Sequence, residues 1–175
     1  MKRAARIALP ICLGVIYSTL GVIRVLSNAL RDAGVLRLTV GVAFAVAIVA
    51  LLVVLGVRGL LKQRRTWVTL ISSAGVYGAV LSQMDSPEEK VHFIEYGVVA
   101  VLAFFAAPER LTGLRRYVAA AVFTLAAGWV DEGIQALLPS RYYDLRDVAF
   151  NATAGVFALC ALAGVTWKAT GTTRV

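Results

Sequence analysis

The stretch Asp85–Tyr96 reads DSPEEKVHFIEY and leads into an apolar run that extends from Val91 to Ala107. Its first residues are typical of a helix start, with Ser86 as N-cap, Pro87 as the first helical residue and Glu89 as the third. Capping does not account for the ionisable side chains that follow a turn or more inside the run. Because ionisable groups inside apolar helices are costly, they indicate a functional site. The stretch therefore predicts a membrane helix with a polar site in its first turns.

The rest of the chain is too apolar for a soluble domain. Of its 175 residues, 59% are hydrophobic, and the mean hydropathy is +0.78, whereas soluble domains are roughly 45–50% apolar. The runs show no alternation, which favours helices over barrel strands. We predict an all-α fold, a polytopic membrane helix bundle with six transmembrane helices. The six runs are Ile7–Ile23, Leu38–Val57, Trp67–Met84, Val91–Ala107, Tyr117–Leu138 and Val148–Trp167.

The chain has a net charge of +8, and its positive residues lie in the links between apolar runs. This placement indicates membrane topology and argues against a nucleic-acid-binding surface. With six helices, twelve of the 18 lysines and arginines fall on one side. We therefore expect both termini to be cytoplasmic and the polar clusters to face outside. Met1–Gly14 resembles a signal peptide, but we expect it to be retained as the first span. Cys12 and Cys160 lie in apolar runs, where we expect no disulfide.

The first polar cluster places three side chains on one helical face, because Glu95 and Tyr96 follow His92 by three and four residues. In the second cluster, Asp131 and Gln135 are four apart and share a face, and Glu132 is offset so that it flanks the site or points elsewhere. Both clusters fall at the same side of the predicted bundle. They predict one site to which several helices contribute.

The residues after Pro139 add charges and a polar seam. Asp144 is a candidate cap for the last helix, and Asp147 continues on one face through Asn151 to Gly155, where a glycine permits close helix approach. Arg141 and Arg146 either pair with these acids or provide a fork for phosphate or carboxylate. Acids and cations at headgroup depth suit a zwitterionic or anionic lipid-like ligand.

The pattern also limits the chemistry. No His-x-x-x-His or Cys-x-x-Cys spacing occurs, so we expect no zinc site of common type, no metal and no cofactor, although a hard divalent ion held through oxygens stays an open alternative. No Gly-x-Ser-x-Gly occurs either. His92 with Glu95, Asp131 or Asp147 is a candidate general acid–base pair.

Two segments resemble the signatures of the VanZ-like family of membrane proteins. The first is Lys90-Val91-His92-Phe93-Ile94-Glu95-Tyr96-Gly97, and the second comprises Asp131, Glu132, Gln135, Arg141, Asp144, Asp147, Asn151 and Gly155. The resemblance implies a four-helix core at residues 65–168, two additional helices at 1–64 and a short polar tail at 169–175. It also implies a bacterial cytoplasmic membrane protein, of a family named after a factor giving low-level resistance to the glycopeptide teicoplanin.

Three functions remain open. The first is binding of a lipid-like envelope component or lipophilic glycopeptide, the second is an enzyme acting on a lipid-linked headgroup, and the third is a proton-coupled transporter. The catalytic candidates, if it is an enzyme, are His92, Asp131 and Asp147. A fourth alternative is structural, in which the same polar residues as a set only hold the helices together. We expect membrane lipids as partners and no nucleic acid, and the oligomeric state is open. The expected ligand-binding residues are Lys90, His92, Glu95, Tyr96, Asp131, Glu132, Gln135, Arg141, Asp144, Arg146, Asp147 and Asn151.

Overall fold

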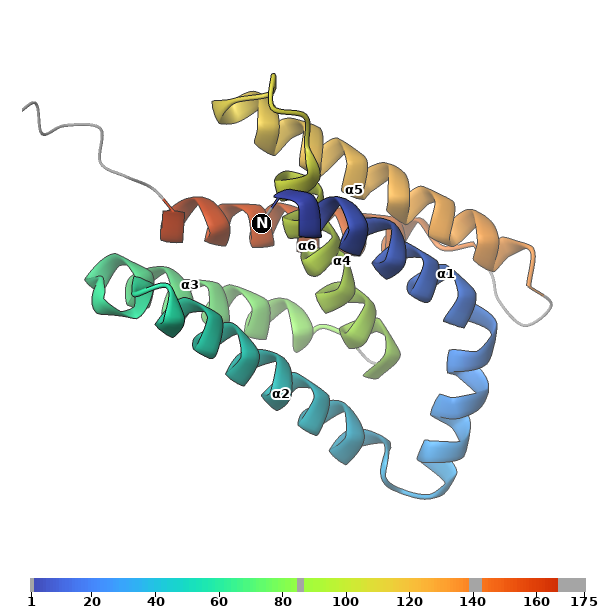
Figure 1. Cartoon of the computed structure of the whole chain (residues 1–175). Helices are drawn as coiled ribbons and strands as arrows, with labels where there is room; N and C mark the ends of the chain where they lie inside the picture. The colour runs from blue at the N-terminus through green and yellow to red at the C-terminus, as the bar shows by residue number, and fades with distance from the viewer. Residues whose placement is uncertain (1, 85–86, 139–142, 167–175) are drawn as a thin grey trace, which may run out of the picture.

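The computed structural model describes residues 2–84, 87–138 and 143–166. These residues form helices and no strand, which confirms the all-α prediction (Figure 1). The elements are α1 (Lys2–Asp32), α2 (Leu36–Val57), the 3-10 helix η1 (Leu60–Lys62), α3 (Arg64–Leu81), α4 (Pro87–Ala106), α5 (Gly113–Ala136) and α6 (Leu145–Thr166).

Four helices are long and apolar enough to cross a membrane, namely α1 over Lys2–Ile23, α2, α5 and α6. The chain is therefore a helical bundle compatible with a membrane. α3 and α4 fall short of that measure within the part of the chain that is described. In α4 the reason is the polar cluster itself, since Glu89, Lys90 and Glu95 interrupt its apolar surface. The first predicted run, Ile7–Ile23, is only part of its helix, because hydropathy marks a membrane segment while a helix can continue beyond it.

α4 occupies the centre of the bundle. It packs against α1, α5 and α6, and α6 packs in turn against α3. Phe93, Tyr96 and Val99 of α4 are fully buried. Small residues bring the helices together, because a Cβ placed on Gly155 of α6 would lie 2.8 Å from Cγ2 of Thr124 in α5. The close approach predicted at Gly155 is confirmed.

The two N-terminal helices differ in their packing. α1 buries Ile16 and Leu20 almost completely and packs on α4 and α5. α2 buries only Leu36 and Leu55, and most of its other large apolar side chains are exposed. Most of the α2 surface therefore needs a lipid or protein environment, whereas α1 is part of the central packing.

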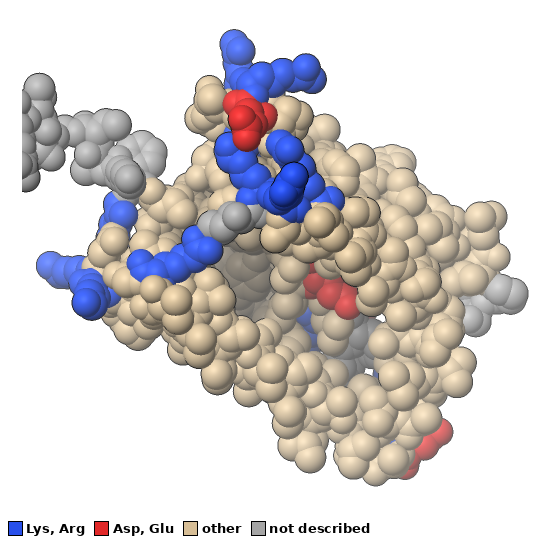
Figure 2. Space-filling view, in the orientation of Figure 1, with Lys and Arg blue, Asp and Glu red and all other residues tan. Residues whose placement is uncertain are grey.

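The start of α1 lies at the same end of the bundle as the link between α4 and α5. Nζ of Lys2 lies 3.1 Å from Oε1 of Glu109 in that link, and Nε of Arg6 donates to the carbonyl of Ala106. Figure 2 shows lysine and arginine side chains gathered over this link and over the link between α2 and α3. The polar residues of α4 and α5 lie at the opposite end of these two helices.

Candidate functional site

The site is built where the first turns of α4 meet the last turns of α5, because these two helices run antiparallel. α4 provides His92, Glu95 and Tyr96, and α5 provides Asp131 and Glu132. In α4 the spacing of three or four residues turns the polar side chains to one face, whereas Asp131 and Glu132 of α5 are adjacent and point in directions about 100° apart. A first group forms around His92 and a second around Glu132.

His92 lies between two carboxylates. Its Nδ1 is 3.4 Å from Oε2 of Glu95 and 3.9 Å from Oδ2 of Asp131. Exposure falls along this line, since the side chain of Glu95 is 37% exposed, that of His92 18% and that of Asp131 0%. The predicted meeting of His92 with Asp131 is therefore present. The imidazole connects a carboxylate at the surface with one inside the bundle.

Two tyrosines lie next to Asp131. The hydroxyl of Tyr96 donates to the carbonyl oxygen of Ala127 at 3.2 Å, and the hydroxyl of Tyr17 donates to the same oxygen at 2.9 Å. Asp131 interacts electrostatically with both phenols and with Glu95. Since Ala127 precedes Asp131 by one helical turn, the tyrosines pack directly beneath the carboxylate.

Tyr17 of α1 is the site residue that sequence reasoning missed. It belongs to a polar triplet, Tyr17-Ser18-Thr19, inside an otherwise apolar run, and that triplet is the signal that could have found it. The hydroxyl of Thr19 donates back to the carbonyl of Val15, so it is satisfied within its own helix. The hydroxyl of Ser18 also donates to the carbonyl of Val15, whereas that of Tyr17 reaches another helix.

Glu132 holds the end of α5 to the start of α6. Its Oε1 accepts a hydrogen bond from Nε2 of Gln135 at 3.1 Å, and its Oε2 accepts one from the backbone N–H of Asp144 at 3.1 Å. The side chain is 1% exposed. Gln135 thus binds Glu132, although its four-residue spacing suggested that it belongs with Asp131. Glu132 has a structural partner on each oxygen.

Asp144 caps α6, as the capping alternative predicted. Its Oδ1 accepts the backbone N–H of Arg146, the second residue of the helix, at 2.8 Å. Arg146 itself is exposed, and its guanidinium carbon lies 5.8 Å from the ring centre of Phe150. These contacts stabilise the start of α6.

Asn151 and Asp147 place α6 beside both groups. Asn151 is 3% exposed, and a Cβ on Gly128 would lie 3.2 Å from the Cβ of Asn151 and 3.7 Å from Cε1 of Tyr96. Asp147 is half-buried and interacts electrostatically with Glu132, as does Asp131. Glu132 therefore lies close enough to Asp147 and to Asp131 for the charges of both carboxylates to act on it.

Lys90 and Arg141 are the remaining predicted residues. Lys90 is half-buried in the first turns of α4. Arg141 lies outside the described residues, together with Asp85 and Ser86 of the first polar stretch. The proposed arginine fork for an anionic group is thus described only at Arg146.

The described side chains can hold and move a proton, since an imidazole lies beside carboxylates, and they can accept hydrogen bonds from hydroxyl or ammonium groups. No set of three or more His, Cys, Asp and Glu residues in the described ranges is arranged to hold a metal ion. Cys12 and Cys160 are free thiols, as predicted.

Comparison of the chain with family models, curated proteins and solved structures finds no match. The resemblance to VanZ-like proteins therefore rests on the residues of the two polar segments.

Proposed function

We propose that this chain is a VanZ-like integral membrane protein of the bacterial cell envelope. In this proposal all six helices cross the cytoplasmic membrane, and both termini are cytoplasmic. The polar site faces outside and binds the headgroup of a lipid-like envelope component or a lipophilic glycopeptide. Such binding would give low-level resistance of the teicoplanin type.

The contact of His92 with Glu95 and Asp131 carries this proposal. Glu132 and Asp144 are occupied by hydrogen bonds within the protein, whereas His92 and Glu95 are partly exposed. A partly exposed imidazole and carboxylate at headgroup depth can bind the hydroxyl and amine groups of a polar headgroup. A buried carboxylate behind them favours a fixed orientation of the imidazole.

Binding to the reconstituted full chain tests the proposal. Fluorescently labelled teicoplanin and a short-chain phosphatidylethanolamine serve as probes, and His92→Ala and Glu95→Gln are the variants. We expect at least one probe to bind the native chain and to bind both variants several-fold more weakly. Glu109→Gln, at the other end of the bundle, is the control and should retain full affinity. Unchanged affinity in His92→Ala and Glu95→Gln would exclude this site as the binding site.

A second candidate function is an enzyme that acts on a lipid-linked headgroup. The observation that favours it is the position of His92 between an exposed and a buried carboxylate, which suits proton transfer. Lipid profiles of cells that express the native chain or a folded His92→Ala variant test it. A changed profile that depends on His92 would favour catalysis over binding, and identical profiles with and without the native chain would count against it.

A further inference from the structure

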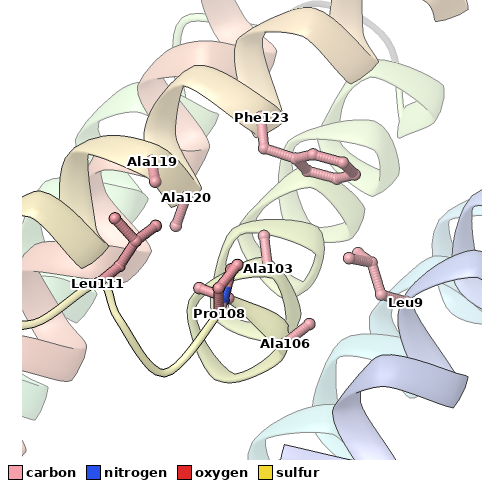
Figure 3. A pocket seen from close by; sticks show the side chains of 9 residues that line it. Leu9, Ala103, Ala106, Pro108, Leu111, Ala119, Ala120 and Phe123 are labelled. Carbon is pink, nitrogen blue, oxygen red and sulfur yellow. The ribbon is translucent and has the colours of Figure 1, made fainter.

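An apolar hollow lies at the end of α4 and α5 that is remote from His92. It has a volume of about 290 Å³ and is lined by α1, α4, α5 and the link between α4 and α5 (Figure 3). Leu9 of α1 faces it from one side, Ala103 and Ala106 of α4 from another, and Ala119 and Phe123 of α5 from a third. The alanines leave this space because larger side chains would fill it. Because its lining is mostly apolar, this hollow, which is open on one side, favours contact with apolar groups over contact with water.

Two arginines are fixed at the α4 end of this hollow. Nε of Arg6 donates to the carbonyl of Ala106 at 3.4 Å, and Nη2 of Arg116 donates to the carbonyl of Ala107 at 3.0 Å. Ala106 and Ala107 both line the hollow. The guanidinium groups therefore lie beside it, each held through the backbone of a lining residue.

Capping of the last carbonyls of α4 uses only part of the hydrogen-bonding capacity of these two arginines. A cation beside the last carbonyls of a helix is favourable in any case, and a guanidinium has five N–H donors. Arg116 also stacks on Phe104, with its guanidinium carbon 5.4 Å from the ring centre. Its Nε is buried and has no hydrogen-bond partner among the residues that the structure describes. That buried Nε is closed to a ligand, but Arg6 is exposed and each guanidinium has further N–H groups for an acceptor.

The charge around this end is positive. Lys2, Arg6 and Arg116 all interact with the carboxylate of Glu109, so three cations surround one anion. Arg110, in the same link, is exposed. A single carboxylate cannot neutralise this set, and the excess charge favours an anionic ligand.

We propose that this end binds an anionic glycerophospholipid. One acyl chain occupies the hollow, and the headgroup phosphate binds Arg6 and Arg116, whose planar groups match phosphate oxygens. Anionic lipids attract clusters of Lys and Arg at a membrane surface. This site is separate from the headgroup site at His92 and does not depend on it.

Lipid retention measured by native mass spectrometry tests the proposal. The purified full chain is offered phosphatidylglycerol and phosphatidylcholine with identical acyl chains. We expect the native chain to retain phosphatidylglycerol preferentially. In the double variant Arg6→Gln with Arg116→Gln, the ratio of retained phosphatidylglycerol to retained phosphatidylcholine should fall roughly tenfold, which corresponds to about 1.4 kcal/mol. Arg64→Gln, which removes one positive charge from the exposed start of α3, should keep this preference.

A second variant tests the hollow itself. Ala119→Phe fills the space and should reduce retention of both lipids, with helix content by circular dichroism as the control for folding. If the double arginine variant does not fold, Arg116→Lys replaces it, since lysine keeps the charge but loses the fork and should give a partial loss of preference. Equal retention of the two lipids by the native chain would overturn the proposal. So would an equal loss in Arg64→Gln, or full retention in Ala119→Phe.

Discussion

The two ends of the α4–α5 pair differ in how the space between the helices is filled. At the end that contains His92, polar side chains fill the space between the helices, and Asp131, Glu132 and Asn151 are almost fully buried. At the other end, alanines leave an apolar hollow, and the cations lie outside it. Packing at the polar end is tight and specific, whereas packing at the basic end leaves room for a ligand. The same two helices thus provide a buried polar cluster at one end and an open apolar hollow at the other.

Removing the hydrogen-bonded acid at the polar end should have the largest effect. Glu132→Ala leaves the amide of Gln135 and the backbone N–H of Asp144 without their acceptor, and we expect a loss of roughly 2 kcal/mol in the free energy of unfolding. Unfolding in mixed detergent micelles measures this. Glu109→Ala at the basic end is the matched control, because that carboxylate is exposed. Equal losses for the two acids would refute the contrast between the ends.

The tight packing of α6 on α5 should also resist an added methyl group. Gly155→Ala brings a Cβ against Thr124, and we expect a cost of about 1–3 kcal/mol in unfolding free energy. Gly133→Ala is the matched control, because a Cβ there meets no atom within 4 Å. Since alanine favours a helix over glycine, Gly133→Ala should be neutral or stabilising. If both variants behave alike, Gly155 does not set the helix separation.

The contribution of α1 to the polar end should be smaller. Tyr17→Phe removes one of the two hydroxyls that donate to Ala127, and interhelical polar contacts in membranes average about 0.6 kcal/mol. We expect a decrease of that size in the same unfolding experiment. Because Tyr96 still binds the carbonyl, a decrease above about 2 kcal/mol would show that Tyr17 holds more than this one bond.

The smallest effect should come from the ion pair at the basic end. The hydrogen bond and charge of Lys2 lower the pKa of Glu109 from its ordinary value. A lowered folded-state pKa stabilises the protein above the ordinary pKa, and this stabilisation is lost as the pH falls through the folded-state pKa. Because both side chains are exposed, solvent screens the pair and stability should barely change. Lys2→Ala should raise the Glu109 pKa, as measured by NMR titration, and an unchanged pKa would contradict the contact.

Much of the helix order could be predicted from the sequence. Each predicted apolar run overlaps one observed helix, because a long apolar run can be recognised from its residue composition. The ends were harder to place. α1 continues to Asp32, well past the run that ends at Ile23, since polar residues can extend a helix beyond its apolar part.

The candidate site was predictable as a set of residues but not as a set of contacts. Helical spacing placed His92, Glu95 and Tyr96 on one face, and the structure brings them to Asp131. Spacing also paired Gln135 with Asp131, yet Gln135 binds Glu132. Along a helix, residues three and four apart are both neighbours, so sequence alone cannot choose between these partners.

The sequence by itself determined that the chain is an apolar helical protein and that most of its acidic residues lie in two segments, because both properties depend on residue type and local order. Only the tertiary structure decided that Tyr17 of α1 reaches the carbonyl beneath Asp131 and that facing alanines leave a hollow beside Arg6 and Arg116. Tyr17 and Ala127 are 110 positions apart, and Arg6 and Ala106 are 100 positions apart. Their positions follow from how whole helices pack, which no local pattern encodes.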